Sequence, residues 1–150
     1  MKKVVSAFVF LLVAASLQAQ IKNPVKWTFS SKKINDKTYE LHMIASIDPG
    51  WHIYTIDHSA DIGVATSVSF NQNPLGVVTG KLKAVGKPIS MKDPSTGDNV
   101  KFYERTVDLV QIITLKAPVK TNFTGSVEFM SCDDKQCLPP ATKPFSIALQ

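Results

Sequence analysis

The feature that most constrains the fold is a succession of short runs in which apolar and polar residues alternate. Alternation with a period of two is typical of a half-buried β-strand, and no window longer than about ten residues has the period of a helix. Turn-forming Pro, Gly, Asn and Asp gather between the runs, for example at 48–50, 71–76 and 93–97. The runs expected to form strands are residues 25–31, 38–47, 51–56, 66–70, 77–85, 100–103, 106–115, 125–130 and 145–149.

Strands of this number and spacing predict an all-β fold, an immunoglobulin-like sandwich of two antiparallel sheets. No repeat or linker interrupts the pattern, so one domain is expected over residues 20–150. Two segments exceed the length of a hairpin turn, 57–64 and 89–99. Long loops often carry function, but the turn-rich composition of 89–99 favours a mere connection over a cover for a site.

Residues 1–19 have the composition of a secretory signal peptide. Lys2 and Lys3 precede an apolar run that ends in small residues near Ala19. The alternative, a membrane anchor, is disfavoured because the run is shorter than the ~20 residues of a spanning helix. We therefore expect the chain to be exported with cleavage near Ala19, without stable membrane insertion.

The charge of the chain argues against nucleic acid as a partner. The formal net charge of +5 includes Lys2 and Lys3, so the exported chain carries +5 − 2 = +3. Its lysines are scattered between acidic residues and form no basic stripe. The three histidines lack the spacing of a zinc site, and no Ser-His-Asp arrangement or glycine-rich phosphate loop occurs.

Cys132 and Cys137 are the only cysteines of the chain and are separated by four residues. An even cysteine count in an oxidising compartment predicts one disulfide. Closing so short a loop removes little entropy from the unfolded chain, and the resulting stabilisation is roughly 2 kcal/mol. A purely structural disulfide would stabilise the fold more if it joined residues further apart in the sequence. This favours reversible thiol–disulfide exchange. Two alternatives stay open: a binding or adaptor domain with a purely structural disulfide, and a copper carrier using the cysteines with Met130, His52 or Met91.

The two sulfurs are expected to differ. Asp133 and Asp134 follow Cys132 and disfavour its thiolate, whereas Cys137 has Lys135 two residues away. Cys137 is therefore the better candidate for the exposed, attacked sulfur. The two prolines at 139–140 stiffen the exit from the loop.

The segment 129–140, with both cysteines and the two prolines, resembles the carboxy-terminal signature of the amino-terminal periplasmic domain of the thiol:disulfide interchange protein DsbD. Residues 48–54, Asp-Pro-Gly-Trp-His-Ile-Tyr, resemble a second block of that family. The resemblance covers most of the chain, from about residue 25 to residue 149. It implies an immunoglobulin-like sandwich in the periplasm that relays electrons without a cofactor, as part of a protein-disulfide reductase system and of cytochrome c biogenesis.

For individual residues, the resemblance implies that Cys132 and Cys137 are the redox pair and that Cys137 forms the mixed disulfides. His52 and Tyr54 match aromatic residues that line the family's active site. Without the resemblance they would be read as one face of an ordinary strand, with Trp51 and Ile53 on the other face.

Two departures from the family pattern affect the expected partners and the shielding of the site. Family members often carry fused membrane and thioredoxin-like domains that this sequence does not contain. The expected partners are therefore a separate membrane thiol reductase and thioredoxin-like periplasmic oxidoreductases. The family's cap loop shields the cysteines with an aromatic side chain, whereas Met91 is the only large apolar residue in the stretch 91–99. Met91 is thus the expected lining residue from this loop.

Overall fold

The computed structural model describes residues 22–59, 63–93 and 96–150. Within these residues the chain forms eleven β-strands and no helix. In chain order the strands are β1 (Val25–Lys33), β2 (Thr38–Ile47), β3 (His52–Tyr54), β4 (Ser67–Phe70), β5 (Gly76–Val85), β6 (Ile89–Lys92), β7 (Asn99–Glu104), β8 (Thr106–Leu115), β9 (Thr121–Phe129), β10 (Ser131–Cys132) and β11 (Ala141–Leu149).

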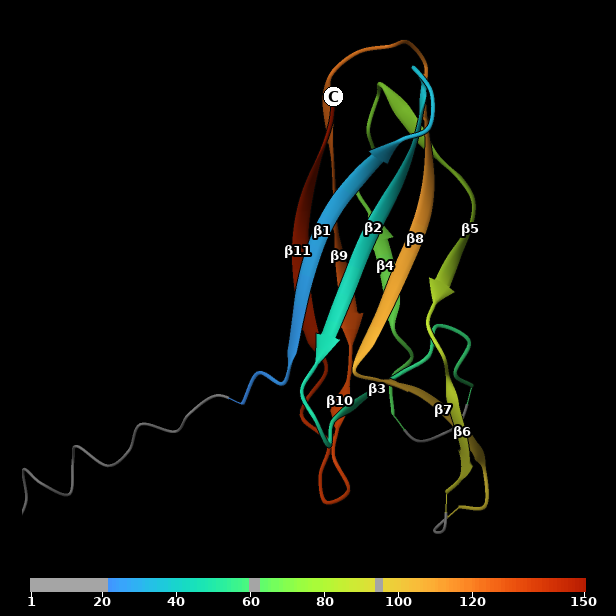
Figure 1. Cartoon of the computed structure of the whole chain (residues 1–150), viewed down its shortest axis with the longest axis vertical. Helices are drawn as coiled ribbons and strands as arrows, with labels where there is room; N and C mark the ends of the chain where they lie inside the picture. The colour runs from blue at the N-terminus through green and yellow to red at the C-terminus, as the bar shows by residue number, and fades with distance from the viewer. Residues whose placement is uncertain (1–21, 60–62, 94–95) are drawn as a thin grey trace, which may run out of the picture.

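Two antiparallel sheets face each other and a third closes one end. The first sheet has the strand order β1-β2-β8-β5, and the facing sheet has the order β11-β9-β4. A third antiparallel sheet, β10-β3-β7-β6, lies at the end of the sandwich opposite the C-terminus (Figure 1). We call it the end sheet. The predicted all-β, immunoglobulin-like architecture is confirmed, with the end sheet as an addition to the expected two sheets.

The alternation read from the sequence places one face of each sandwich strand in the core. Every second residue of β2 is buried, from Tyr39 to Ile47, and β8 has the same period from Val107 to Leu115. The facing sheet contributes apolar side chains with the same spacing: Phe123, Val127, Phe129, Phe145, Ile147 and Leu149. Burial of this apolar surface is the main favourable term that stabilises the sandwich.

The end sheet is joined to the sandwich by short chain connections, which hold the strands of the end sheet in place. Chain connections run from β2 to β3, from β7 to β8 and from β9 to β10. Arg105, between β7 and β8, has a left-handed φ of 65°, and its carbonyl accepts the Ile47 N–H at 2.7 Å. The sharp turn at Arg105 therefore joins both sheets at the point where β2 ends.

The predicted bounds of two strands, 38–47 and 106–115, are those observed for β2 and β8. The expectation that 89–99 is a plain loop is wrong for its first four residues, which form β6 against β7, with Ile89 opposite Phe102. The two-residue strand β10 was also missed. β10 depends on pairing with the distant strand β3, which local alternation does not reveal, and β6 is only four residues long.

Some predictions lie outside the described residues. The signal peptide expected over residues 1–19 does so entirely, as do residues 60–62 of the segment 57–64 and residues 94–95 of the segment 89–99. The described residues include no helix of the length and apolarity that crossing a bilayer requires.

Candidate functional site

Cys132 and Cys137 form a disulfide, with their Cα atoms 4.0 Å apart. Cys132 ends β10 and is 1% exposed, packed in a small apolar cluster with Tyr54, Val100 and Phe102. Cys137 lies in the loop after β10 and is exposed. The sequence prediction of one disulfide is confirmed, and the two sulfurs occupy different environments.

A tight turn holds the residues between the cysteines. Oδ1 of Asp133 accepts the backbone N–H groups of Lys135 and Gln136, each at 2.8 Å. These hydrogen bonds to the charged carboxylate lower the pKa of Asp133. The Asp133 N–H donates to the Gln136 carbonyl at 2.9 Å, and the Leu138 N–H donates to the Ser131 carbonyl at 2.9 Å. Asp133 therefore shapes the loop that presents Cys137, a role that the sequence did not indicate.

A cleft of about 480 Å³ opens over the disulfide. Strands β3, β6 and β7 and the cysteine loop form its walls. The cleft brings together all five residues proposed from the sequence, and the lining residues are His52, Tyr54, Met91, Asp93, Val100, Phe102, Cys132, Asp133, Asp134, Lys135, Gln136 and Cys137. The lining of the cleft therefore comes from four separate segments of the chain.

Tyr54 places a hydroxyl beside the buried sulfur. Its oxygen lies 3.8 Å from Sγ of Cys132, and since a disulfide sulfur carries no proton, the hydroxyl is the donor. Burial, and next the charge of Asp93, raise the pKa of Tyr54 above its usual value, so the hydroxyl keeps its proton.

The position of Tyr54 is fixed from three sides. The Thr66 hydroxyl donates to its carbonyl at 2.6 Å, and the His58 ring stacks on its ring at 4.3 Å between centroids. Gly63 completes the pocket, because a Cβ at that position would come within 2.1 Å of the Tyr54 ring. A residue with a side chain at position 63 would therefore displace Tyr54.

His52 lies on the strand next to β10, directly opposite the buried Cys132. It is the register partner of Cys132 on β10 and of Glu104 on β7. Its ring packs on Phe102, with 4.4 Å between centroids, and meets the ring of Tyr54 edge-on at 5.9 Å. Burial lowers the pKa of His52, and the negative charges of Glu104, Asp134 and Asp133 oppose that shift.

Met91 enters the cleft from the edge strand β6. Its side chain is 47% exposed while it contributes to the lining. Asp93 follows, and its Oδ1 accepts the Thr96 N–H at 3.1 Å. Two residues of the segment 89–93, Met91 and Asp93, thus line the cleft, so this segment is more than the plain connection that its composition favoured.

Val100 and Phe102 were missed as site residues by sequence reasoning. They are buried on β7, with Phe102 beneath His52. Their alternation within the predicted strand 100–103 indicated a shared face, but only the pairing of β7 with β3 turns that face toward the cysteines.

No group of three His, Cys, Asp or Glu residues with the geometry of a metal site occurs in the part of the chain that the structure describes. His42 lies on the outer face of β2, where Nδ1 bonds to Oδ2 of Asp108 at 2.7 Å.

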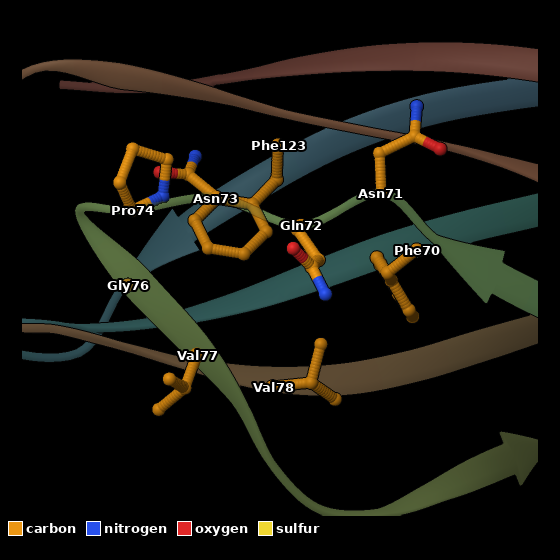
Figure 2. Close-up of a pocket in the computed structure, with 9 residues that line it drawn as sticks. All are labelled: Phe70, Asn71, Gln72, Asn73, Pro74, Gly76, Val77, Val78 and Phe123. Atoms are coloured by element: carbon orange, nitrogen blue, oxygen red, sulfur yellow. The ribbon is translucent and has the colours of Figure 1, made fainter.

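A larger hollow, of about 550 Å³, lies where β4 ends and β5 begins. Figure 2 shows the amides of Asn71, Gln72 and Asn73 with the apolar side chains of Val77, Val78 and Phe123 around it. Its lining contains no cysteine, histidine or charged residue. Of these two hollows, only the cleft over the disulfide is lined by cysteine, histidine and charged residues.

Comparison with solved structures shows the fold of this chain in two bacterial domains. The N-terminal periplasmic domain of ScsB from Proteus mirabilis is 16% identical with a TM-score of 0.54, and the match covers 89% of this chain and 49% of that one. The chain thus spans about half the length of the Proteus structure. The second match is in the structure of the complex between the DsbD N-terminal and PilB N-terminal domains from Neisseria meningitidis. It is 13% identical with a TM-score of 0.52, and the match covers 85% of this chain and 87% of that one.

Comparison with curated proteins finds no match. The sequence of residues 18–149 matches the family described as thiol:disulfide interchange protein DsbD, N-terminal. This match includes both cysteines and every residue that lines the cleft. The chain belongs to the family of DsbD N-terminal domains.

Proposed function

We propose that this protein is a periplasmic thiol–disulfide exchange module that relays electrons through the Cys132–Cys137 pair. In the proposed direction a separate membrane thiol reductase supplies the electrons and thioredoxin-like periplasmic oxidoreductases receive them. Cytochrome c biogenesis is one process that such a relay would serve. Family membership and the disulfide support the exchange chemistry.

The observation that carries the proposal is the unequal exposure of the two bonded sulfurs at the floor of an open cleft. A thiolate of the reductase attacks the exposed sulfur of Cys137, the Cys132–Cys137 bond breaks, and Cys132 leaves and takes up a proton. A second thiolate of the reductase then attacks its own sulfur in the mixed disulfide and releases Cys137. Two electrons have entered the domain, and the same steps in reverse pass them to an oxidised acceptor.

The remaining lining residues have a defined place in this proposal. His52, Tyr54 and Met91 surround the position that the partner's sulfur must reach. Met91 is the side chain from β6 that a partner contacts first, because it is half exposed at the rim.

The solved relatives support the class of partner and the compartment. The Neisseria DsbD domain forms a complex with the PilB N-terminal domain, and the Proteus ScsB domain is periplasmic. The signal peptide predicted over residues 1–19 agrees with export. The membrane reductase as donor rests on the family resemblance of the sequence.

The reduction potential of the Cys132–Cys137 couple tests the proposal. The folded protein is equilibrated with glutathione or dithiothreitol buffers, and circular dichroism follows the fold in both redox states. We expect a potential above about −300 mV with the fold intact, because structural disulfides typically have lower potentials. A lower potential, or loss of the fold on reduction, would overturn the proposal in favour of an adaptor domain with a structural disulfide.

A further inference from the structure

The buried sulfur poses a chemical problem that the exposed one does not. To return to the disulfide after Cys137 has formed a mixed disulfide, Cys132 must lose its proton and attack Cys137. Cys132 is 1% exposed among apolar side chains. Such burial disfavours the thiolate, and so does the negative charge of the adjacent Asp133. A proton acceptor within the cleft would remove this obstacle.

His52 is placed to be that acceptor. In an antiparallel pair, residues directly opposite have their Cβ atoms roughly 5 Å apart and their side chains on the same face. His52 and Cys132 are such a pair, and both line the cleft. The ring packs on Phe102, which keeps it on the cysteine side of the sheet.

The surroundings of the ring suit a base that is neutral before it acts. Burial keeps the pKa of His52 below its ordinary value, so the ring is neutral at neutral pH. The charged and titratable groups that face it can accommodate the imidazolium once it forms; they are Glu104 on β7, Asp133 and Asp134 in the cysteine loop, and the neutral Tyr54 on its own strand.

The other titratable groups on the cleft wall are less suitable. Asp133 uses Oδ1 to hold the turn, and its pKa is lowered further by those hydrogen bonds. Tyr54 keeps its proton and can only donate toward the sulfur. A carboxylate is also a poorer match to a thiol than an imidazole, since the ordinary pKa values are about 4, 8.5 and 6.5 respectively.

We propose that His52 is the general base that takes the proton of the Cys132 thiol in the resolving step. The thiolate of Cys132 then attacks the sulfur of Cys137, the intramolecular S–S bond forms, and the bond to the partner breaks with its electrons leaving on the partner's sulfur. In the opposite direction the His52 imidazolium returns the proton to Cys132 as it leaves. This inference rests on the proposed exchange function.

The reaction of the reduced protein with 5,5′-dithiobis(2-nitrobenzoate) separates the attack by Cys137 from the resolving attack by Cys132. Attack by Cys137 releases the first coloured thiolate and leaves a mixed disulfide, and attack by Cys132 releases the second. Stopped-flow absorbance measures both rates between about pH 6.5 and about pH 8.5 in wild type, His52→Phe, His52→Gln and the control His42→Gln. His42 is a suitable control because it lies on the outer face of the sandwich.

We expect the second release to be nearly independent of pH in wild type. In both His52 variants it should be slower by about 100-fold at neutral pH, and it should rise about tenfold per pH unit as the thiol itself ionises. The first release and the His42→Gln control should be unchanged. These outcomes together support a proton transfer, since lost packing alone would not create a pH slope.

The contrary outcomes are distinguishable. A wild-type second release that rises tenfold per pH unit overturns the role of His52 without any variant, and so does a normal second release in a folded His52 variant. Both results leave the proposed function standing. Absence of the first release in wild type overturns the proposed function, and this inference with it.

Discussion

At the scale of single residues, the two cysteines of the disulfide have different environments and therefore different roles in exchange. Cys137 is exposed in the loop, whereas Cys132 is buried beside the Tyr54 hydroxyl. The neighbours of each cysteine in the sequence already favoured Cys137 as the attacked sulfur. The structure adds Tyr54 and His52 on the side of Cys132, from a strand nearly eighty residues earlier.

Tyr54→Phe should slow the resolving step by about tenfold. A hydrogen bond to a charged group is worth about 1.5 kcal/mol or more, and the hydroxyl donates to the sulfur on which negative charge develops. Because the pKa of Tyr54 is raised, this loss should be the same from about pH 6 to about pH 9. The rate of the resolving step is measured as the second release of the coloured thiolate, 2-nitro-5-thiobenzoate. An unchanged second release would show that the hydroxyl does not act on the sulfur.

At the scale of elements, β9 leads the chain to the cysteines. It is the central strand of the β11-β9-β4 sheet and leads through Met130 into β10. Gly125 lets β4 approach, because a Cβ there would lie 2.2 Å from the Ser69 carbonyl oxygen and 2.7 Å from the Phe145 ring. The backbone oxygen cannot move aside as a flexible side chain could.

Gly125→Ala should therefore lower the free energy of unfolding by about 2 kcal/mol, within the range found for overpacked cores. Urea unfolding followed by tryptophan fluorescence measures the change. Glu128→Ala, on the exposed face of the same strand, is the control and should stay within about 0.5 kcal/mol of wild type. Equal stability of the two variants would mean that β4 shifts without cost.

At the scale of the whole molecule, the sandwich core and the disulfide are separate. The largest buried cluster joins β1, β2, β8, β9 and β11 and reaches Ile53 of β3 and Tyr103 of β7, whereas Cys132 belongs to a smaller cluster in the end sheet. Opening the disulfide therefore leaves the main apolar contacts in place. This separation is what a protein needs if both redox states are to stay folded.

The double variant Cys132→Ser, Cys137→Ser should retain the fold and lose about 2 kcal/mol of stability, since the bond closes a short loop. Reduced wild type should show a loss of similar size. Circular dichroism and urea unfolding of oxidised wild type, reduced wild type and the double variant make the comparison. An unfolded double variant would contradict this and assign the disulfide a structural role.

Sequence alone determined what local pattern encodes. The alternation in 38–47 and 106–115 predicted β2 and β8 to the residue, because one face of each strand is buried in the core. The even cysteine count in a chain expected to be exported predicted the disulfide of Cys132 and Cys137. The same period of two predicted that Trp51 and Ile53 lie on one face of their strand and His52 and Tyr54 on the other. The burial of Ile53 in the main core agrees with this prediction.

Only the tertiary structure decided what lies around the sulfurs. A strand of two residues such as β10 has no readable period, and β6 alternates over only four residues, too few to separate it from the turn-rich segment that follows. β10 pairs with the distant strand β3, and β6 pairs with the next strand, β7; these pairings set Cys132 opposite His52 and Met91 opposite Val100. The cleft exists because strands far apart in sequence share one sheet, a property that local residue preferences do not contain.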